Sequence, residues 1–283
     1  MLTLLFDGIA YGMLLFVLAV GLAVTLGLMN VINLAHGAFA MAGGYVTVLA
    51  MDRLGAPFLA TLPLAFLIPA LLGVVAERLL YRRIYARPHL DHVLFSIALV
   101  FMAVAGVDWL IGSQQQIVKL PEYLQGRFEI GGVGIGRYRL FIVVVCVVLA
   151  LALQAVLART RFGSRLRAAV DDPRVARGLG IDVDRVFAVT FAVGSGLAGL
   201  GGALGAEVLG LDPTFPLKFM IYFLIVVSVG GTTTITGPLG AALLLGIADV
   251  AGKYYVPQLG AFVVYVLMVA ILVWRPRGLF SRA

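Results

Sequence analysis

Three long stretches of this sequence, 92–107, 140–158 and 186–206, contain no ionised side chain. About 20 consecutive apolar residues in a helix are enough to cross the hydrocarbon core of a bilayer. Inside lipid every backbone N–H and C=O needs an internal partner, so only helices and closed barrels can span it. The sequence lacks the alternating ten-residue segments that are typical of a barrel. We therefore expect an all-α fold, a polytopic transmembrane helical bundle.

The composition fits this class. Hydrophobic residues make up 62% of the 283 residues and charged residues 12%, about half of the charged fraction of an average soluble domain. The predicted helical runs are 4–28, 37–51, 58–76, 92–111, 140–158, 186–209, 218–230, 238–252 and 259–274. Short runs beside polar breaks indicate discontinuous or re-entrant elements. We expect about eight or nine membrane helices in one transmembrane domain, 1–283. Whether 37–51 crosses the membrane decides on which side the N-terminus lies.

Basic residues gather in three hydrophilic segments. Of the 21 Lys and Arg residues, four arginines lie within 78–87, seven within 159–185 and three within 275–282. Loops this basic stay on the cytoplasmic side of a membrane, which accounts for the net charge of +7 without a nucleic-acid partner. The N-terminus lacks the pattern of a signal peptide. We expect a multi-pass membrane protein with a cytoplasmic C-terminus and with 112–139 outside, where it is either a docking face or a solvated loop.

Two polar breaks interrupt the apolar runs in corresponding parts of the two halves. The first reads NVINLAHG and the second GGTTTITGP. Corresponding interruptions of this kind indicate a transport pathway, although Asn and Thr side chains equally form hydrogen bonds between membrane helices. The candidate pathway residues are Asn30, Asn33, His36, Gly37, Thr232, Thr233, Thr234 and Thr236.

Small residues recur along the run 186–209. Gly194, Ala198, Gly202 and Ala206 fall four apart on one face, and Ser195, Gly199 and Ala203 form a second stripe. Such stripes let helix backbones approach closely, so this helix is expected to be central, with a second subunit as one candidate neighbour. Glu207, Asp108 and Asp249 lie near the ends of predicted runs, where interfacial solvation explains a charge most simply.

The basic segment 159–185 contains a short, well-delimited helix. Asp172 before Pro173 predicts an N-cap and first turn, and Gly180 predicts the C-terminal stop. Val175, Ala176 and Leu179 are expected on one face. The helix either rests on anionic lipid or inserts this apolar ridge into a cytoplasmic partner. The candidate docking residues are Asp172, Pro173, Arg174, Val175, Ala176, Arg177, Gly178, Leu179, Gly180 and Ile181.

Other chemistries have little support in the sequence. None of the three lysines lies in a phosphate-binding Gly-x-x-x-x-Gly-Lys-Ser/Thr motif, so energy from ATP would enter through another polypeptide. The pair His89 and His92 lacks further ligands for a metal, and Cys146 has no cysteine with which to form a disulfide. No nucleophile–base pair is visible. We expect a non-enzyme without a metal or other cofactor.

Four segments carry a resemblance to a known family: GLMNVINLAHGAFAMAGGYV, LRAAVDDPRVARGLGIDVDRVFAVTFAVGSGLAGLGGAL, VGGTTTITGPLGAALLLG and the terminal RPRGLF. Together, and in this order, they resemble permease subunits of branched-chain amino acid ABC importers. The resemblance implies that Gly178 to Ile181 and the helix before them form the coupling element that docks on an ATPase subunit. This sequence departs from the family at GGTTTITG, where many relatives have a Gly-Leu-Gly-Ser-like run.

The resemblance also implies a location in the bacterial inner membrane, a substrate class and a set of partners. The partners are two ATP-binding cassette ATPase subunits, a second homologous permease, a periplasmic substrate-binding protein and the lipid membrane. Relatives carry branched-chain amino acids, urea, amides or other small acids, so the departure at GGTTTITG leaves the exact solute open. The alternatives are a secondary transporter that works alone, which would normally have an ionisable residue deep in the bundle, and a membrane-embedded enzyme, for which His36 has no evident partner.

Overall fold

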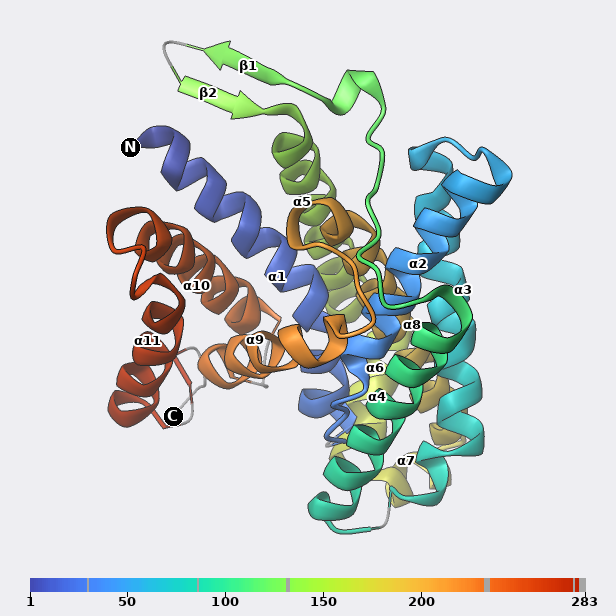
Figure 1. Ribbon diagram of the computed structural model, residues 1–283. Helices are drawn as coiled ribbons and strands as arrows, with labels where there is room; N and C mark the ends of the chain where they lie inside the picture. The colour runs from blue at the N-terminus through green and yellow to red at the C-terminus, as the bar shows by residue number, and fades with distance from the viewer. Residues whose placement is uncertain (30, 86, 131–132, 232–234, 277, 280–283) are drawn as a thin grey trace.

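The computed structural model describes residues 1–29, 31–85, 87–130, 133–231, 235–276 and 278–279. Within these ranges the chain forms eleven α-helices and one two-stranded hairpin (Figure 1). The helices are α1 Leu2–Met29, α2 His36–Leu54, α3 Phe58–Leu79, α4 His89–Ile111, α5 Arg137–Arg159, α6 Arg161–Asp171, α7 Pro173–Gly178, α8 Val183–Leu209, α9 Phe215–Gly230, α10 Thr236–Tyr255 and α11 Gly260–Trp274. The predicted all-α class is confirmed.

Five helical segments in the described part of the chain are long and apolar enough to cross a membrane. They are Leu2–Gly27, Phe58–Arg83, His89–Ile111, Arg137–Arg159 and Val183–Leu209. Phe215–Gly230 and Phe262–Trp274 are apolar but shorter. α1 runs from the N-terminus toward the other end of the molecule, and α2 runs back (Figure 1). The N-terminus and α7 lie at opposite ends of the molecule. We call the end that holds α7 the α7 end and the other the hairpin end.

The hairpin lies in the segment 112–139, which the sequence placed outside the membrane, as a docking face or a solvated loop, without predicting a strand. β1 Arg127–Ile130 pairs antiparallel with β2 Val133–Gly136, and Arg127 lies opposite Gly136. The chain before it is tied to the turn after α8, because the Gln116 backbone N–H donates to the Leu211 carbonyl oxygen at 2.7 Å. This end of the molecule is therefore an ordered surface rather than a set of separate loops.

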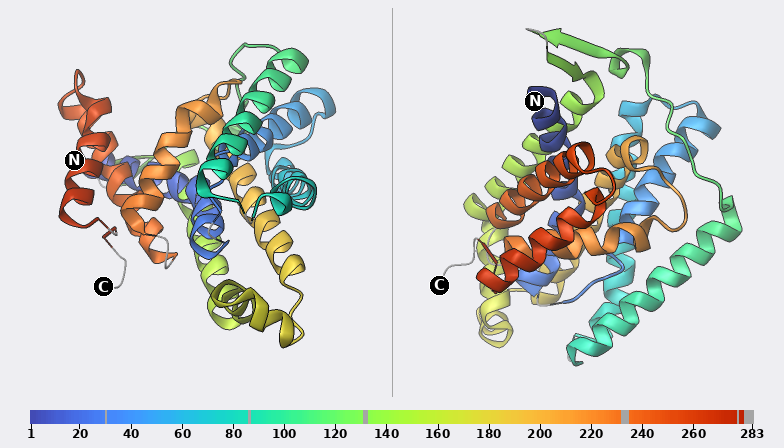
Figure 2. Two further views of the ribbon diagram at one scale, coloured as in Figure 1. Left: turned by 90° about the horizontal axis from the view of Figure 1, so that it is seen from below. Right: turned by 60° about the vertical axis from the view of Figure 1, so that its left-hand side comes forward.

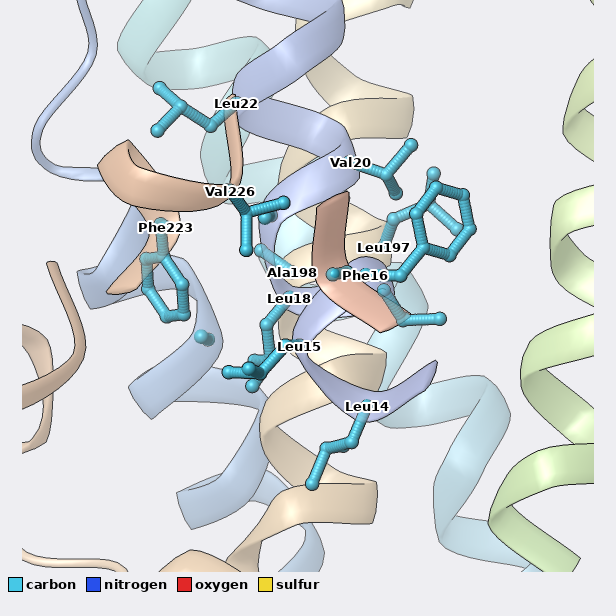
Figure 3. Packing of buried hydrophobic residues seen from close by; sticks show 14 of the residues in the cluster. Leu14, Leu15, Phe16, Leu18, Val20, Leu22, Leu197, Ala198, Phe223 and Val226 are labelled. Atoms are coloured by element: carbon cyan, nitrogen blue, oxygen red, sulfur yellow. The ribbon is translucent and has the colours of Figure 1, made fainter. Parts of the chain in front are cut away.

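α1 and α8 form the centre of the bundle. After Asp7, α1 has no charged residue, and its side chains pack among α8 and α9, as Figure 3 shows for Leu14 and Leu18 of α1, Leu197 of α8 and Phe223 of α9. α4 and α5 instead expose most of their apolar surface, and α4 stands apart at the edge of the bundle (Figure 2). A helix that is apolar on every side is either surrounded by protein or faces lipid, and both kinds occur here.

Small residues set the spacing around α8. The Cα of Gly202 lies so close to α2 that a Cβ atom there would overlap the Ala40 carbonyl oxygen, and a Cβ at Gly194 would lie 3.2 Å from the Gly21 carbonyl oxygen of α1. Ala198 and Ala206 are also buried. The stripes of α8 thus pack on helices of the same chain. The sequence did not indicate which helices these are, and the structure shows that they are α1, α2 and α3.

Candidate functional site

α7 has the local structure that its sequence predicts. The Asp172 carboxylate accepts hydrogen bonds from the backbone N–H groups of Arg174 and Val175, at 2.8 and 3.0 Å, and Pro173 occupies the first turn. Gly180 has φ +80°, a conformation that costs glycine little, and the next N–H, that of Ile181, donates to the Ala176 carbonyl oxygen at 3.0 Å. Both ends of this short helix are therefore closed by hydrogen bonds.

The apolar ridge of α7 is narrower than predicted. Val175 and Leu179 are 57% and 75% exposed. Ala176, expected on the same face, is buried in a small second core with Leu166, Ala169, Val183 and Val186. This difference has a physical reason, because Ala176 lies on the side of α7 that packs against α6 and α8, whereas Val175 and Leu179 lie away from that contact. The exposed ridge is the pair Val175 and Leu179.

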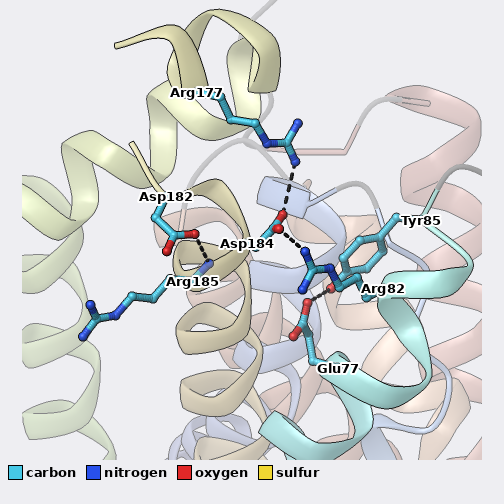
Figure 4. A network of polar contacts seen from close by, with 7 residues as sticks. All are labelled: Glu77, Arg82, Tyr85, Arg177, Asp182, Asp184 and Arg185. Carbon is cyan, nitrogen blue, oxygen red and sulfur yellow. Dashed lines mark hydrogen bonds and ion pairs between the residues drawn. The ribbon is translucent and has the colours of Figure 1, made fainter. Parts of the chain in front are cut away.

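α7 is also tied to two long helices by charged side chains. Asp184, in the first turn of α8, forms ion pairs with Arg177 of α7, at 3.2 Å, and with Arg82 after α3 (Figure 4). The Tyr85 hydroxyl donates to Glu77 of α3 at 2.9 Å, and Asp182 caps α8. Exposed ion pairs stabilise a fold by about 1 kcal/mol at most, so these contacts orient α7 more than they stabilise it. The first two arginine-rich segments thus meet at one end of the molecule.

The described residues of the first polar break make contacts between helices. The Tyr81 hydroxyl donates to Oδ1 of buried Asn33 at 2.6 Å. Nε2–H of buried His36 donates to the Leu18 carbonyl oxygen of α1 at 2.8 Å, and a Cβ at Gly37 would lie 3.0 Å from Cα of Pro216 in α9. These contacts favour the second reading of this break, hydrogen bonding between helices, and its pathway role stays a prediction.

The second polar break lies where α9 and α10 meet. A Cβ at Gly230 would lie 2.5 Å from the Pro238 backbone nitrogen, and Thr236 starts α10 with its side chain exposed. The Leu279 N–H donates to the Val229 carbonyl oxygen at 2.8 Å, which brings the basic C-terminal segment to this break. Asn30, Thr232, Thr233 and Thr234 lie outside the described residues.

The Asn33 contact allows a direct test of the structural reading. Tyr81→Phe removes the donor from the buried Asn33 Oδ1, and an unsatisfied buried polar atom costs about 1–3 kcal/mol. We expect a lower melting temperature of the purified protein in detergent. Tyr123→Phe is the matched control, because the Tyr123 side chain is exposed. Equal melting temperatures for the two variants would show that the hydrogen bond does not stabilise the fold.

A polar cleft, which the sequence did not indicate, opens at the hairpin end. It has a volume of about 490 Å³ and lies between the starts of α1, α5 and α9 and the last turns of α8 and α10. Its polar lining includes Asp7, Tyr11, Arg139, Lys218, Asp249 and Lys253. Asp7 of α1 and Arg139 of α5 form an ion pair across it. The cleft therefore combines both signs of charge inside an otherwise apolar bundle.

Asp249 corrects a sequence prediction. Interfacial solvation was expected for it, but its side chain is only 2% exposed, and Oδ2 accepts from the Lys253 ammonium at 2.6 Å. Asp108 and Glu207 are exposed, as predicted. One signal was available: a Lys four residues after an Asp within an apolar helix indicates a paired charge on one helix face. The burial itself depends on α1 and α9, which cover that face.

Comparisons with known proteins give one family match and several similar proteins. Residues 4–272 match the family described as the permease component of branched-chain amino acid transport systems. The chain is 26% identical over 293 aligned positions to the high-affinity branched-chain amino acid transport system permease protein BraD of Pseudomonas aeruginosa, with 98% of this chain and 95% of that protein covered. It is 27% identical over 297 positions to the corresponding LivH of Escherichia coli K12, with 98% and 94% covered.

A third similar protein comes from Methanocaldococcus jannaschii. The probable branched-chain amino acid transport permease protein LivH of Methanocaldococcus jannaschii is 27% identical over 286 positions, with 96% of this chain and 90% of that protein covered. No solved structure matches the chain significantly. The matched relatives are transport permeases, not enzymes, and the five long apolar helices agree with a multi-pass membrane protein. Because the family match spans nearly the whole chain, this protein belongs to the permease components of branched-chain amino acid transport systems.

Proposed function

We propose that this chain is the permease subunit of an ATP-driven importer for branched-chain amino acids or similar small polar solutes. Its segment 159–185 is the cytoplasmic coupling loop within a single membrane domain, 1–283. Two ATPase subunits, a second homologous permease and a periplasmic binding protein complete the transporter. The protein lies in the bacterial inner membrane with its C-terminus and α7 in the cytoplasm, so that the cleft and the N-terminus face outward.

The observation that carries this proposal is the exposed, capped α7. Val175 and Leu179 leave about half or more of their surface open in a charged segment, and apolar side chains on a short helix are typical anchors for a groove on a partner. Ion pairs of Asp184 join this helix to α3 and α8. A partner that binds α7 would therefore act on two membrane helices at once.

α8 supplies a mechanical connection across the molecule. It runs unbroken from Val183, beside α7, to Leu209, which lines the cleft. Its 27 residues span about 40 Å at 1.5 Å per residue. A tilt of α8 that begins at α7 would change the cleft at the other end. ATP must then bias the outward-open and inward-open states through different ATPase contacts in each state, because a ligand shifts an equilibrium only by its differential affinity.

The proposal is tested by reconstitution in liposomes. We expect uptake of labelled leucine when the permease pair, the ATPases and the binding protein are present with ATP, and no accumulation by this chain alone under a proton or sodium gradient. Competition by isoleucine, valine, urea and acetamide then ranks the solutes. Gradient-driven accumulation by the chain alone would support a secondary transporter and overturn the importer.

A further inference from the structure

The buried carboxylate of Asp249 has an unused acceptor at the wall of the cleft. Oδ2 is paired with Lys253, whereas Oδ1 is buried and has no hydrogen-bond partner among the described residues. Leaving a charged acceptor unsatisfied within a membrane bundle is costly. Such an atom therefore points to a donor that visits the cleft.

The rest of the lining limits what that donor can be. The cations of the cleft already have partners: Arg139 pairs with Asp7, Lys253 with Asp249, and Lys218 with Asp212. Groups of three or more His, Cys, Asp or Glu side chains that could hold a metal are absent from the described residues. A small organic ammonium group, with its several donors, fits one free carboxylate oxygen better than a metal ion does.

The apolar lining adds a second requirement. Leu14, Ile142, Leu209 and Phe219 line the same cleft as Asp249, so the visitor needs an aliphatic part as well as an ammonium group. The Lys218 ammonium has three donors, and the ion pair with Asp212 uses one of them. A carboxylate could accept from the others. The volume of about 490 Å³ lies within the range of small-molecule sites.

We propose that the cleft is a zwitterion site in which Oδ1 of Asp249 accepts from the α-ammonium group of an aliphatic amino acid. Lys218 holds the carboxylate end, and the aliphatic side chain packs on Leu14, Ile142 and Phe219. This proposal rests on the proposed function, because it makes the outward-facing cleft the first site that the solute meets in the membrane domain. It assigns substrate recognition to α10 rather than to the two polar breaks.

Binding is measured directly on the purified complex of full-length permease and ATPase. Saturation-transfer NMR without ATP compares leucine with 4-methylpentanoate, which has the same aliphatic chain and carboxylate but no ammonium group. We expect leucine to bind, and 4-methylpentanoate to bind at least about tenfold more weakly. A lost hydrogen bond to a charged group costs about this much in affinity. Equal binding of the two probes would overturn the ammonium site.

Variants test the residue itself. Asp249→Asn is expected to weaken leucine binding by about tenfold or more, and Asp52→Asn, an exposed Asp on α2, serves as the matched control with unchanged binding. The single variant leaves the Lys253 ammonium unpaired and can therefore be unstable. The double variant Asp249→Asn with Lys253→Gln removes both charges of the ion pair, and it should also fail to bind leucine. Unchanged leucine binding by the folded Asp249→Asn protein would overturn the proposal.

Two further outcomes are distinguishable. If Asp249→Asn leaves leucine binding intact but weakens association of the two permease subunits, the acceptor serves a cation of the partner subunit and the zwitterion site is wrong. If wild-type protein binds leucine through Asp249 but shows no ATP-driven uptake, the importer fails while the binding site stands. The NMR measurement needs neither ATP nor the periplasmic binding protein, so it separates the two proposals.

Discussion

Replacing both Val175 and Leu179 with Asp should abolish association of the ATPase with this permease. Each exposed apolar side chain of α7 is expected to occupy a groove, and loss of such an anchor costs about 2 kcal/mol or more. Together the two losses lower the affinity about a thousandfold, and burial of two new carboxylates adds to the cost. Co-purification of the ATPase with tagged permease from solubilised membranes measures the effect.

The fold of the membrane domain should not change in that variant. Both side chains already face solvent, so the amount of protein in the membrane and its size-exclusion profile should equal those of the wild type. Ser164→Asp with Arg165→Gln is the charge-matched control, because it also lowers the charge of this segment by two at exposed positions on α6. If the control loses the ATPase equally, charge rather than the apolar ridge governs docking; if the Asp variant keeps the ATPase, α7 is not the docking helix.

Gly202→Ala should destabilise the protein strongly. The added Cβ would overlap the Ala40 carbonyl oxygen, and this obstacle is backbone, which cannot rotate away as a side chain could. α2 and α8 must therefore separate along their contact. Overpacking of a core costs about 1–3 kcal/mol, and we expect the upper part of this range because the contact lies at the centre of the bundle.

Thermal unfolding in detergent, followed by fluorescence-detected size exclusion, measures this effect. Gly106→Ala in α4 is the matched control, since a Cβ there meets no atom of the described residues within 4 Å. That variant should be neutral or slightly more stable, because Ala favours a helix over Gly by about 1 kcal/mol. If the Gly202→Ala protein has the same melting temperature as the Gly106→Ala control, α2 and α8 are not packed this closely.

The helices themselves could be predicted from the sequence with few errors. The run 140–158 corresponds to α5, Arg137–Arg159, and 92–111 to α4, His89–Ile111. Apolar runs bounded by charged residues leave the backbone one solution in lipid, a helix that satisfies its own hydrogen bonds. The N-cap at Asp172 could be predicted for a similar reason, because it depends only on residues next to it in the sequence. The hairpin was missed, although two short runs around the dipeptide Gly131-Gly132 had the pattern of one.

The candidate site was predicted less well, for a physical reason. The sequence pointed to polar residues in the breaks, and the structure engages Asn33 and His36 in contacts between helices. It also pointed to a ridge that included Ala176, which packing buries. Which face of a helix is covered depends on its neighbours, and these come from distant parts of the chain.

By itself, the sequence determined that this chain is a helical membrane protein, where its helices begin and end, and that a capped helix interrupts them at Asp172. These features follow from short-range rules, namely hydrophobic length, backbone hydrogen bonding and capping. Only the tertiary structure decided that the N-terminus lies opposite α7, that Asp249 is buried, and that five helix ends enclose a cleft. Those features depend on how α1 and α8 bring remote segments together, because burial and cavities are properties of packed helices and not of any single one.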